Sequence, residues 1–122
     1  MTQQFNGLEI TAELLPFDGN FQQIPEKTYT KWFDYDKIKG TLSLRHRQPG
    51  GYLTLPSGGR KTLKSWMIDE KIPRQEREEI WLLAEEKHIL WIVGHRISAY
   101  YKITEQTKTI LEVEFNGGKS SG

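Results

Sequence analysis

The stretch of this chain whose residue types could do chemistry runs from Pro56 to Arg77 and reads PSGGRKTLKSWMIDEKIPRQER. It combines a pair of glycines, six Lys or Arg side chains and one tryptophan. Adjacent glycines let backbone amides approach a phosphate group, and Lys and Arg neutralise phosphates. The stretch could therefore form a nucleotide-binding loop, a nucleic-acid surface, or an amphipathic helix with a charged outer face.

A nucleotide-binding loop does not fit these residues. The phosphate-cradling motif of ATP-binding proteins needs a Gly-Lys-Ser/Thr sequence, and here Arg60 stands where the lysine belongs. The three histidines, His46, His88 and His95, are too scattered to form a metal motif, and there is no cysteine to supply a thiolate. We therefore predict no catalytic residue, no cofactor-binding residue and no metal site in this chain.

Charge is distributed unevenly along the chain although the formal net charge is only +1. Residues 1–36 carry a net charge of −4 and residues 75–122 a net charge of −2, whereas residues 37–74 carry +7. A basic segment in an otherwise acidic chain is typical of a surface that binds a polyanion, although it can also serve solubility alone. The candidate RNA-binding residues are Arg45, Arg47, Arg60, Lys61, Lys64, Lys71 and Arg74.

The elements that must position these cations are mostly strands. Alternating apolar and polar residues predict short strands over residues 8–15, 28–35, 41–47, 80–84, 89–94, 100–104 and 109–115. Residues 48–59 are predicted to form a loop, because two prolines and four glycines would interrupt a ladder of hydrogen bonds. All four tryptophans lie in apolar patterns typical of core packing, Trp66 and Trp91 most clearly.

One amphipathic helix is predicted over about residues 60–70. Its residues Leu63, Trp66 and Met67 share one face, with the basic side chains beside them. Pro73 cannot continue this helix and suits the start of a second one. On the strand over residues 41–47, Arg45 and Arg47 share the face opposite the leucines, so we expect both arginines to face solvent.

Length and composition favour one domain. The chain has 122 residues, of which 36% are hydrophobic, enough for one ordinary core. It lacks cysteine, any apolar run of the roughly 20 residues that a membrane helix needs, and a basic start followed by an apolar run. These features predict a cytoplasmic protein without a membrane partner, and residues 116–122 are predicted to form a disordered tail.

Four stretches carry a resemblance to a known family. FDYDKIKGTLSLRHRQPGG, KTLKSWMIDEKIPRQEREEIWLL, and ILWIVGHRI with YKITEQTKTIL resemble, in order and spacing, the C-terminal domain of bacterial tRNA(Ile)-lysidine synthetase. The resemblance covers about Phe33 to Leu111, and the residues before it are similar to that domain's usual opening. It implies one α+β domain over residues 1–115. The implied fold has three layers, a mixed or antiparallel β-sandwich of unusual topology and two short helices, similar to a domain of the phenylalanyl-tRNA synthetase β subunit.

The resemblance also implies a function. Enzymes of this family use ATP to ligate lysine to the wobble cytidine, C34, of the isoleucine tRNA with a CAU anticodon, and their catalytic domain is N-terminal and absent from this chain. The chain is then a tRNA-recognition module for the acceptor-stem side of tRNA(Ile). By itself it would not be an enzyme and would need no cofactor; ATP would belong to the parent enzyme, which could also provide a homodimer. The alternative is a structural or oligomerisation domain that braces the enzyme without touching RNA.

This chain also departs from the family pattern at two places. The family often follows the Pro-Gly of the basic loop with Asp-Arg-Phe, whereas Gly51, Tyr52 and Leu53 stand here, so one acid and one cation are missing. Trp81 stands where the family favours proline, which we interpret as a change in local packing. The residues that match the family's basic positions are Arg45, Arg47, Lys61, Lys64, Lys71 and Arg74.

Overall fold

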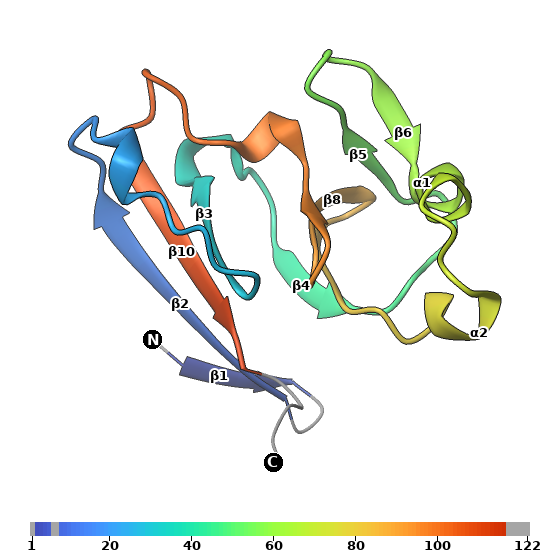
Figure 1. Ribbon diagram of the computed structural model, residues 1–122. Coiled ribbons are helices and arrows are strands. Elements are labelled where there is room, and N and C mark those ends of the chain that lie inside the picture. Colours follow the sequence, from blue (N-terminus) through green and yellow to red (C-terminus); the bar gives the residue numbers. More distant parts are fainter. Residues whose placement is uncertain (1, 6–7, 117–122) are drawn as a thin grey trace. The chain divides into compact units, whose positions relative to one another are not determined.

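The structure is a computed structural model that describes residues 2–5 and 8–116. The chain divides into two compact units, one formed by residues 1–37 with 102–122 and the other by Ile38–Tyr101 (Figure 1). No helix among the described residues is long and apolar enough to span a membrane. Apart from Asn116, the predicted tail over residues 116–122 lies outside the described residues.

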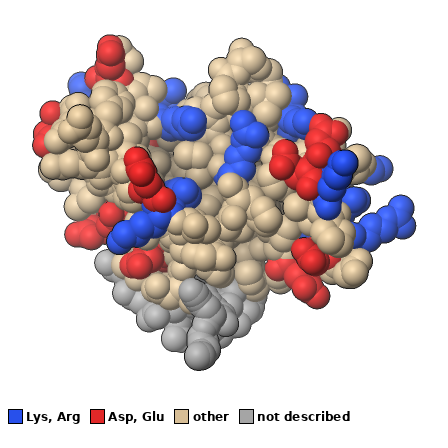
Figure 2. Space-filling model, viewed as in Figure 1, with Lys and Arg blue, Asp and Glu red and all other residues tan. Residues whose placement is uncertain are grey.

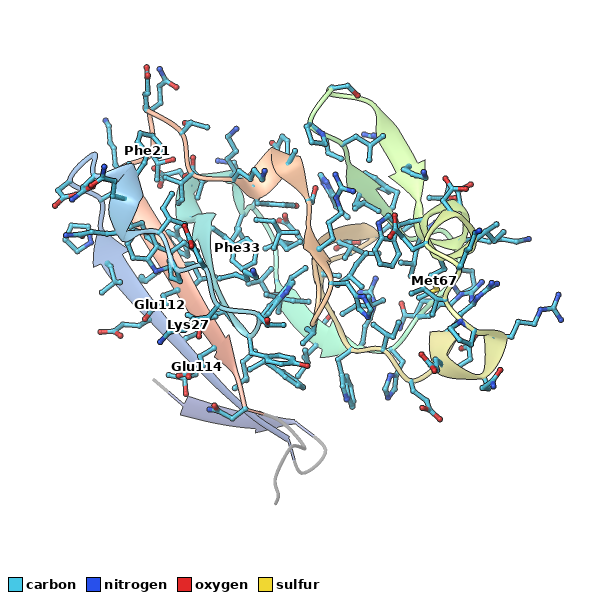
Figure 3. All side chains as sticks on the ribbon, in the orientation of Figure 1. Phe21, Lys27, Phe33, Met67, Glu112 and Glu114 are labelled. Atoms are coloured by element: carbon cyan, nitrogen blue, oxygen red, sulfur yellow. The ribbon has the colours of Figure 1, made fainter. Side chains whose placement is uncertain are left out.

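The first unit is an antiparallel sheet in the order β1-β2-β10-β3. Its strands and two short 3₁₀ turns are β1 (Thr2–Phe5), β2 (Leu8–Pro16), η1 (Phe21–Gln23), β3 (Thr30–Asp34), η2 (Tyr35–Lys37) and β10 (Thr109–Phe115). On one face Trp32 Nε1 donates to Glu112, which Figure 3 labels on β10, at 3.0 Å. Thr107 Oγ1 donates to the buried Asp34 carboxylate at 2.9 Å, which satisfies that charge inside the unit.

The second unit is a mixed sheet in the order β4-β7-β8-β5-β6, with β9 paired to β8. All its pairs are antiparallel except β5 with β8, which run parallel through Tyr52 and His88. Its elements are β4 (Leu42–Arg45), β5 (Tyr52–Thr54), β6 (Arg60–Thr62), α1 (Leu63–Asp69), α2 (Arg74–Arg77), β7 (Leu82–Glu85), β8 (His88–Ile92), β9 (Arg96–Ile97) and η3 (Ala99–Tyr101). The predicted α+β class, with mixed and antiparallel sheets and two short helices, is confirmed. The likeness to the phenylalanyl-tRNA synthetase domain stays a prediction.

Helix α1 packs through the face that its sequence predicts. Leu63, Trp66 and Met67 are at most 4% exposed and join Leu53, Leu82, Ala84, Ile89 and Ile92 in one apolar cluster. Met67 is labelled in Figure 3. The prediction that Trp66 and Trp91 are core residues is confirmed, because Trp91 is fully buried too. Trp32 and Trp81 are only half-buried.

The predicted start of this helix at residue 60 is wrong. Arg60 and Lys61 lie in strand β6, where they pair with Thr54 and Leu53 of β5. The helix begins only after Thr62, whose Oγ1 accepts a hydrogen bond from Ser65 N at 3.1 Å and so acts as the N-cap. Strand pairing therefore claims the residues that the helical periodicity alone would include.

Two other predicted elements also differ. The predicted loop over residues 48–59 contains β5, because its glycines and prolines lie outside Tyr52–Thr54 and Leu53 enters the core. The predicted strand over residues 100–104 is instead the 3₁₀ turn η3 followed by a turn. There Thr107 N donates to Thr104 O at 3.1 Å, and Thr107 Oγ1 accepts from Thr104 N at 2.8 Å, so local bonds replace a ladder.

The carboxylate of Glu85, at the end of β7, joins three segments of the second unit. It accepts hydrogen bonds from Tyr101 Oη at 2.8 Å, from Lys39 N at 2.6 Å and from Gly40 N. Burial alone would raise the pKa of Glu85, but these three hydrogen bonds and the nearby His88 offset it, so the pKa lies below its ordinary value. Burial and the same contact raise the pKa of Tyr101.

Acid should therefore weaken the fold through Glu85. A carboxyl group whose pKa is lowered by folding contributes stability above its unfolded pKa, about 4.3, and loses it as pH falls through the folded value. We expect urea-unfolding midpoints of the wild type to drop on acidification below about pH 4.5, and Glu85→Gln to show a smaller drop from a lower starting point. Glu79→Gln, which removes an exposed carboxylate of the same unit, should keep the wild-type response. An unaltered acid response in Glu85→Gln would contradict this assignment.

Trp66→Ala should destabilise the protein by about 3–5 kcal/mol, because it removes a large side chain that is 4% exposed and leaves a cavity. Ile68→Ala is the matched control on the same helix; Ile68 is 50% exposed, so its truncation should change stability by at most about 0.5 kcal/mol. Chemical denaturation of the three proteins measures both effects. A Trp66→Ala protein as stable as the control would show that this side chain does not belong to the core.

Candidate nucleic-acid interface

All seven candidate cations belong to the second unit, on β4, β6, α1, α2 and the segments next to them. Figure 2 shows Lys and Arg side chains interspersed with Asp and Glu on the side of the molecule that carries these helices. The net charge of the segment is therefore a poor guide to which cations can meet an anion. The contacts of each side chain separate cations held by the protein from cations left open.

Arg45 is held by the protein. Its guanidinium donates to the carbonyl oxygen of Glu86, in the turn between β7 and β8, and to Ser43 Oγ at 3.2 Å. The side chain is half-buried, so the expectation that it simply faces solvent is wrong. This geometry gives Arg45 a bracing role on the turn, and RNA binding by Arg45 stays a prediction.

Lys61 is also engaged within the unit. From β6 its ammonium forms an ion pair with Asp69 at the end of α1, and the Lys61 side chain is 27% exposed. Much of its charge is thus neutralised locally, and an RNA phosphate would have to compete with a carboxylate for it.

Arg60, the next residue before Lys61, has a different environment. Its guanidinium carbon lies 4.4 Å from the centroid of the Tyr52 ring, and Tyr52 stacks on His88 at 4.6 Å. Burial and then the Arg60 charge lower the pKa of His88, against a smaller opposing effect of Glu85. The cation–π contact orients Arg60 while the residue stays exposed and able to meet an anion.

A cavity of about 260 Å³ brings two candidate cations together. Its lining residues are Arg47, Gln48, Pro49, Gly50, Gly51, Thr62, Leu63 and Lys64. The Arg47 side chain, 25% exposed, contacts Met67 Sδ at 3.9 Å and lies 3.5 Å from a carboxylate oxygen of Glu78. Lys64 is exposed on the first turn of α1. An arginine fork and an ammonium at one small cavity form a suitable environment for an anion.

Lys87 is a cation near this cavity that the sequence analysis missed. Gly50 has a positive φ of 85°, and a Cβ placed on it would lie 3.3 Å from the Lys87 ammonium nitrogen. The backbone supports this approach, because Tyr52 N donates to Lys87 O at 2.9 Å. The sequence signal was weak, since Lys87 follows two glutamates in a turn and lies outside the basic segment.

Lys71 and Arg74 are exposed at the junction of the two helices. Lys71 follows α1 with a positive φ of 58°, and Arg74 is the first residue of α2. Nearby, Arg77 Nε donates to Ile72 O at 2.8 Å, which holds the second helix against the end of the first. Lys71 and Arg74 are thus presented by a junction that is itself tied down.

The strand predicted over residues 41–47 ends at Arg45, before His46. His46 is exposed, its ring lies 3.8 Å from the Trp81 ring in a stacked arrangement, and its Nδ1 lies 3.3 Å from Ile80 O. The contact supports the interpretation of Trp81 as a packing residue. Among residues 2–5 and 8–116, no three His, Asp or Glu side chains gather as metal ligands would.

Comparison with known proteins places the chain in a family and matches its fold to a solved structure. A family model described as the TilS substrate C-terminal domain matches residues 42–114, which include all seven candidate cations. A solved structure described as the TILS C-terminal domain superposes with a TM-score of 0.68 at 26% identity, covering 94% of this chain and 88% of that one.

Similar proteins in several bacteria bear the name tRNA(Ile)-lysidine synthase. The one from Caldanaerobacter subterraneus subsp. tengcongensis is 46% identical over 88 residues, or 71% of this chain and 19% of that protein. The one from Dehalococcoides mccartyi is 37% identical over 111 residues, or 90% of this chain and 23% of that protein. The chain spans about a fifth of the length of these curated relatives. With more than half of its residues matched by the family model, the chain belongs to the TilS substrate C-terminal domain family.

Proposed function

We propose that this chain is the tRNA-recognition module of a tRNA(Ile)-lysidine synthase and binds the acceptor-stem side of tRNA(Ile). The observation that carries the proposal is the group of cations around the 47–51 loop and α1, where Arg47 and Lys64 line one cavity and Lys87 lies beside it. Exposed Arg60, Lys71 and Arg74 extend this basic surface.

The physical chemistry of RNA supports a surface of this kind. Phosphates contribute most of the affinity of a protein for RNA, and side chains fixed by secondary structure can follow the regular spacing of a base-paired stem. Arg47, Arg60 and Lys64 lie on or beside β4, β6 and α1, and the contacts of Arg47 with Met67 and of Arg60 with Tyr52 limit their side-chain freedom. A preorganised arrangement favours recognition of duplex shape over recognition of a flexible strand.

Catalysis would belong to the rest of the parent protein. The relatives are about four times as long as this chain and are named for the synthase reaction. The proposal therefore places the ligation of lysine to C34, and the ATP that drives it, outside these 122 residues. It also places the parent enzyme in the cytoplasm, where its tRNA is. Any homodimer would form through contacts made by the parent enzyme.

The alternative function, a brace without RNA contact, has one observation in its favour. Arg45 and Lys61 are engaged by Glu86 and Asp69, so part of the basic segment serves the fold. A brace would predict that the remaining exposed cations can be removed without consequence for RNA binding.

Arg47→Ala/Lys64→Ala should weaken binding of tRNA(Ile) and flatten its dependence on salt. For every phosphate that the variant no longer neutralises, the slope of log affinity against log salt should fall by about 0.7–0.9. A fluorescence-anisotropy titration at several salt concentrations measures both quantities. A hairpin with the acceptor stem should compete better than a single strand of equal length, because the proposal rests on duplex shape.

Lys102→Ala/Lys108→Ala is the control, since it removes two exposed cations from the other compact unit. It should retain the wild-type slope. If the Arg47/Lys64 variant is folded and matches wild type in affinity and slope, the brace is the better proposal. An equal decrease of affinity in both variants would indicate attraction by overall charge without a defined interface.

A separate prediction concerns the reaction. The chain alone, incubated with ATP, lysine and tRNA(Ile), should release no pyrophosphate above the blank, because its sequence contains no complete Gly-x-x-x-x-Gly-Lys-Ser/Thr motif to hold a triphosphate. Release by protein freed of full-length enzyme would contradict the division of labour proposed above.

A further inference from the structure

Arg47 lies at the border between two cavities. Besides the cavity shared with Lys64, it lines a second one of about 360 Å³ together with Gln48, Pro49 and Glu78. Its Nη1 lies 3.5 Å from Glu78 Oε2, and the Glu78 side chain is 70% exposed. The guanidinium therefore has a carboxylate partner on one side and a cavity with a second cation on the other.

We infer that a single RNA phosphate group binds in the cavity between the 47–51 loop and the start of α1. In the absence of RNA, Glu78 forms an ion pair with Arg47, and the phosphate displaces Glu78 when it binds. The inference rests on the proposed function and adds to it a defined subsite and an internal competitor. It also gives Glu78, an acidic residue, a part in setting the affinity for RNA.

The size and lining of the cavity support a phosphate. About 260 Å³ is large enough for one phosphate group with water, and too small to enclose a nucleotide together with its neighbours. Arg47 presents a fork that matches two phosphate oxygens, whereas Lys64 supplies a point charge. Gly50 and Gly51 line the cavity without side chains, so the loop does not obstruct the approach of a ligand.

Lys87 adds a third cation from a distant part of the sequence. Its ammonium nitrogen lies 3.3 Å from the position that a Cβ of Gly50 would occupy, at the loop that lines the cavity. The two lining cations thus come from the segment after β4 and from α1, and Lys87, beside the loop that lines the cavity, comes from the turn between β7 and β8. Only a folded unit brings these three segments together.

Glu78, like a phosphate, presents a negatively charged oxygen to the Arg47 guanidinium. An exposed ion pair of this kind contributes little free energy. A phosphate, which can accept two parallel hydrogen bonds from one guanidinium, can therefore replace the carboxylate with little loss of stability. Removing the carboxylate should therefore leave Arg47 free and tighten RNA binding. Glu79 provides a comparison, because it is the next residue, is exposed like Glu78 and lies outside the lining of both cavities.

The experiment is a double-mutant cycle on the whole chain, with an acceptor-stem RNA hairpin as the probe. Glu78→Gln should bind the hairpin about two- to fivefold more tightly than wild type. Glu79→Gln removes the same charge and should change affinity by clearly less. In an Arg47→Ala background Glu78→Gln should not increase the affinity for the hairpin, because Glu78 then has no Arg47 guanidinium to compete for. Lys87→Gln should weaken binding and lower the salt slope by about 0.7–0.9.

Changing the chemical group at the 5′ end of the hairpin shows whether the bound phosphate is an internal phosphodiester or the 5′-terminal phosphate. Hairpins carrying a 5′-hydroxyl or a 5′-monophosphate should both shift the backbone amide resonances of Gly50 and Gly51 if an internal phosphodiester fills the subsite. A shift only with the monophosphate would assign the subsite to the 5′ end. No shift with either probe would overturn the inference.

The outcomes separate this inference from the proposed function. If wild type does not bind the hairpin or tRNA(Ile), the proposed function fails. If wild type binds but Glu78→Gln behaves like Glu79→Gln, or gains equally with and without Arg47, the proposed function stands and the Glu78 competitor is overturned. Circular dichroism of each variant verifies that it is folded.

Discussion

The carboxylate of Glu85 is the interaction on which the second unit most depends. It receives hydrogen bonds from the segment that leads into β4, at Lys39 and Gly40, and from Tyr101 at the end of the unit. One side chain therefore holds both ends of Ile38–Tyr101 against the β7–β8 hairpin in its middle. The hairpin's own turn is held in the same way from another side, because Arg45 donates to Glu86 O. A turn fixed from two sides places Lys87 reproducibly beside Gly50.

The candidate cations of the second unit fall into two groups, those held by contacts within the unit and those left exposed. Arg45 and Lys61 are engaged within the unit, and Arg47 is shared between Glu78 and a cavity. Lys64, Lys71 and Arg74 are exposed. The proposed function assigns contact with tRNA to the exposed group. Net charge along the sequence cannot distinguish these cases, since it depends on which carboxylate or carbonyl lies opposite each cation.

Local patterns predicted the features that local physics determines. The stripe of Leu63, Trp66 and Met67 follows from helical periodicity alone and is buried as expected. The start of that helix was missed because Arg60 and Lys61 pair as a strand with the neighbouring β5. Strand β5 was missed because its three residues are flanked by glycines and prolines, which mark the turns around it. Lys87 was missed because its approach to Gly50 exists only once β5 lies beside β8. The order and spacing of the matching stretches predicted the family where periodicity could not.

The parallel pairing of β5 with β8 also bears on how the chain folds. Parallel strands cannot be joined by a tight turn. The chain between Tyr52 and His88 contains β6, α1, α2 and β7, and these two residues can pair only when that segment has folded back on itself. Contacts between residues far apart in sequence carry a large loop-closure entropy and form slowly. The loop that carries Gly50 is anchored by this pairing, through the bond from Tyr52 N to Lys87 O. We therefore expect the loop that carries Gly50 to become ordered late in folding, at the same stage as Leu53 of β5 joins the apolar cluster beside Ile89 of β8.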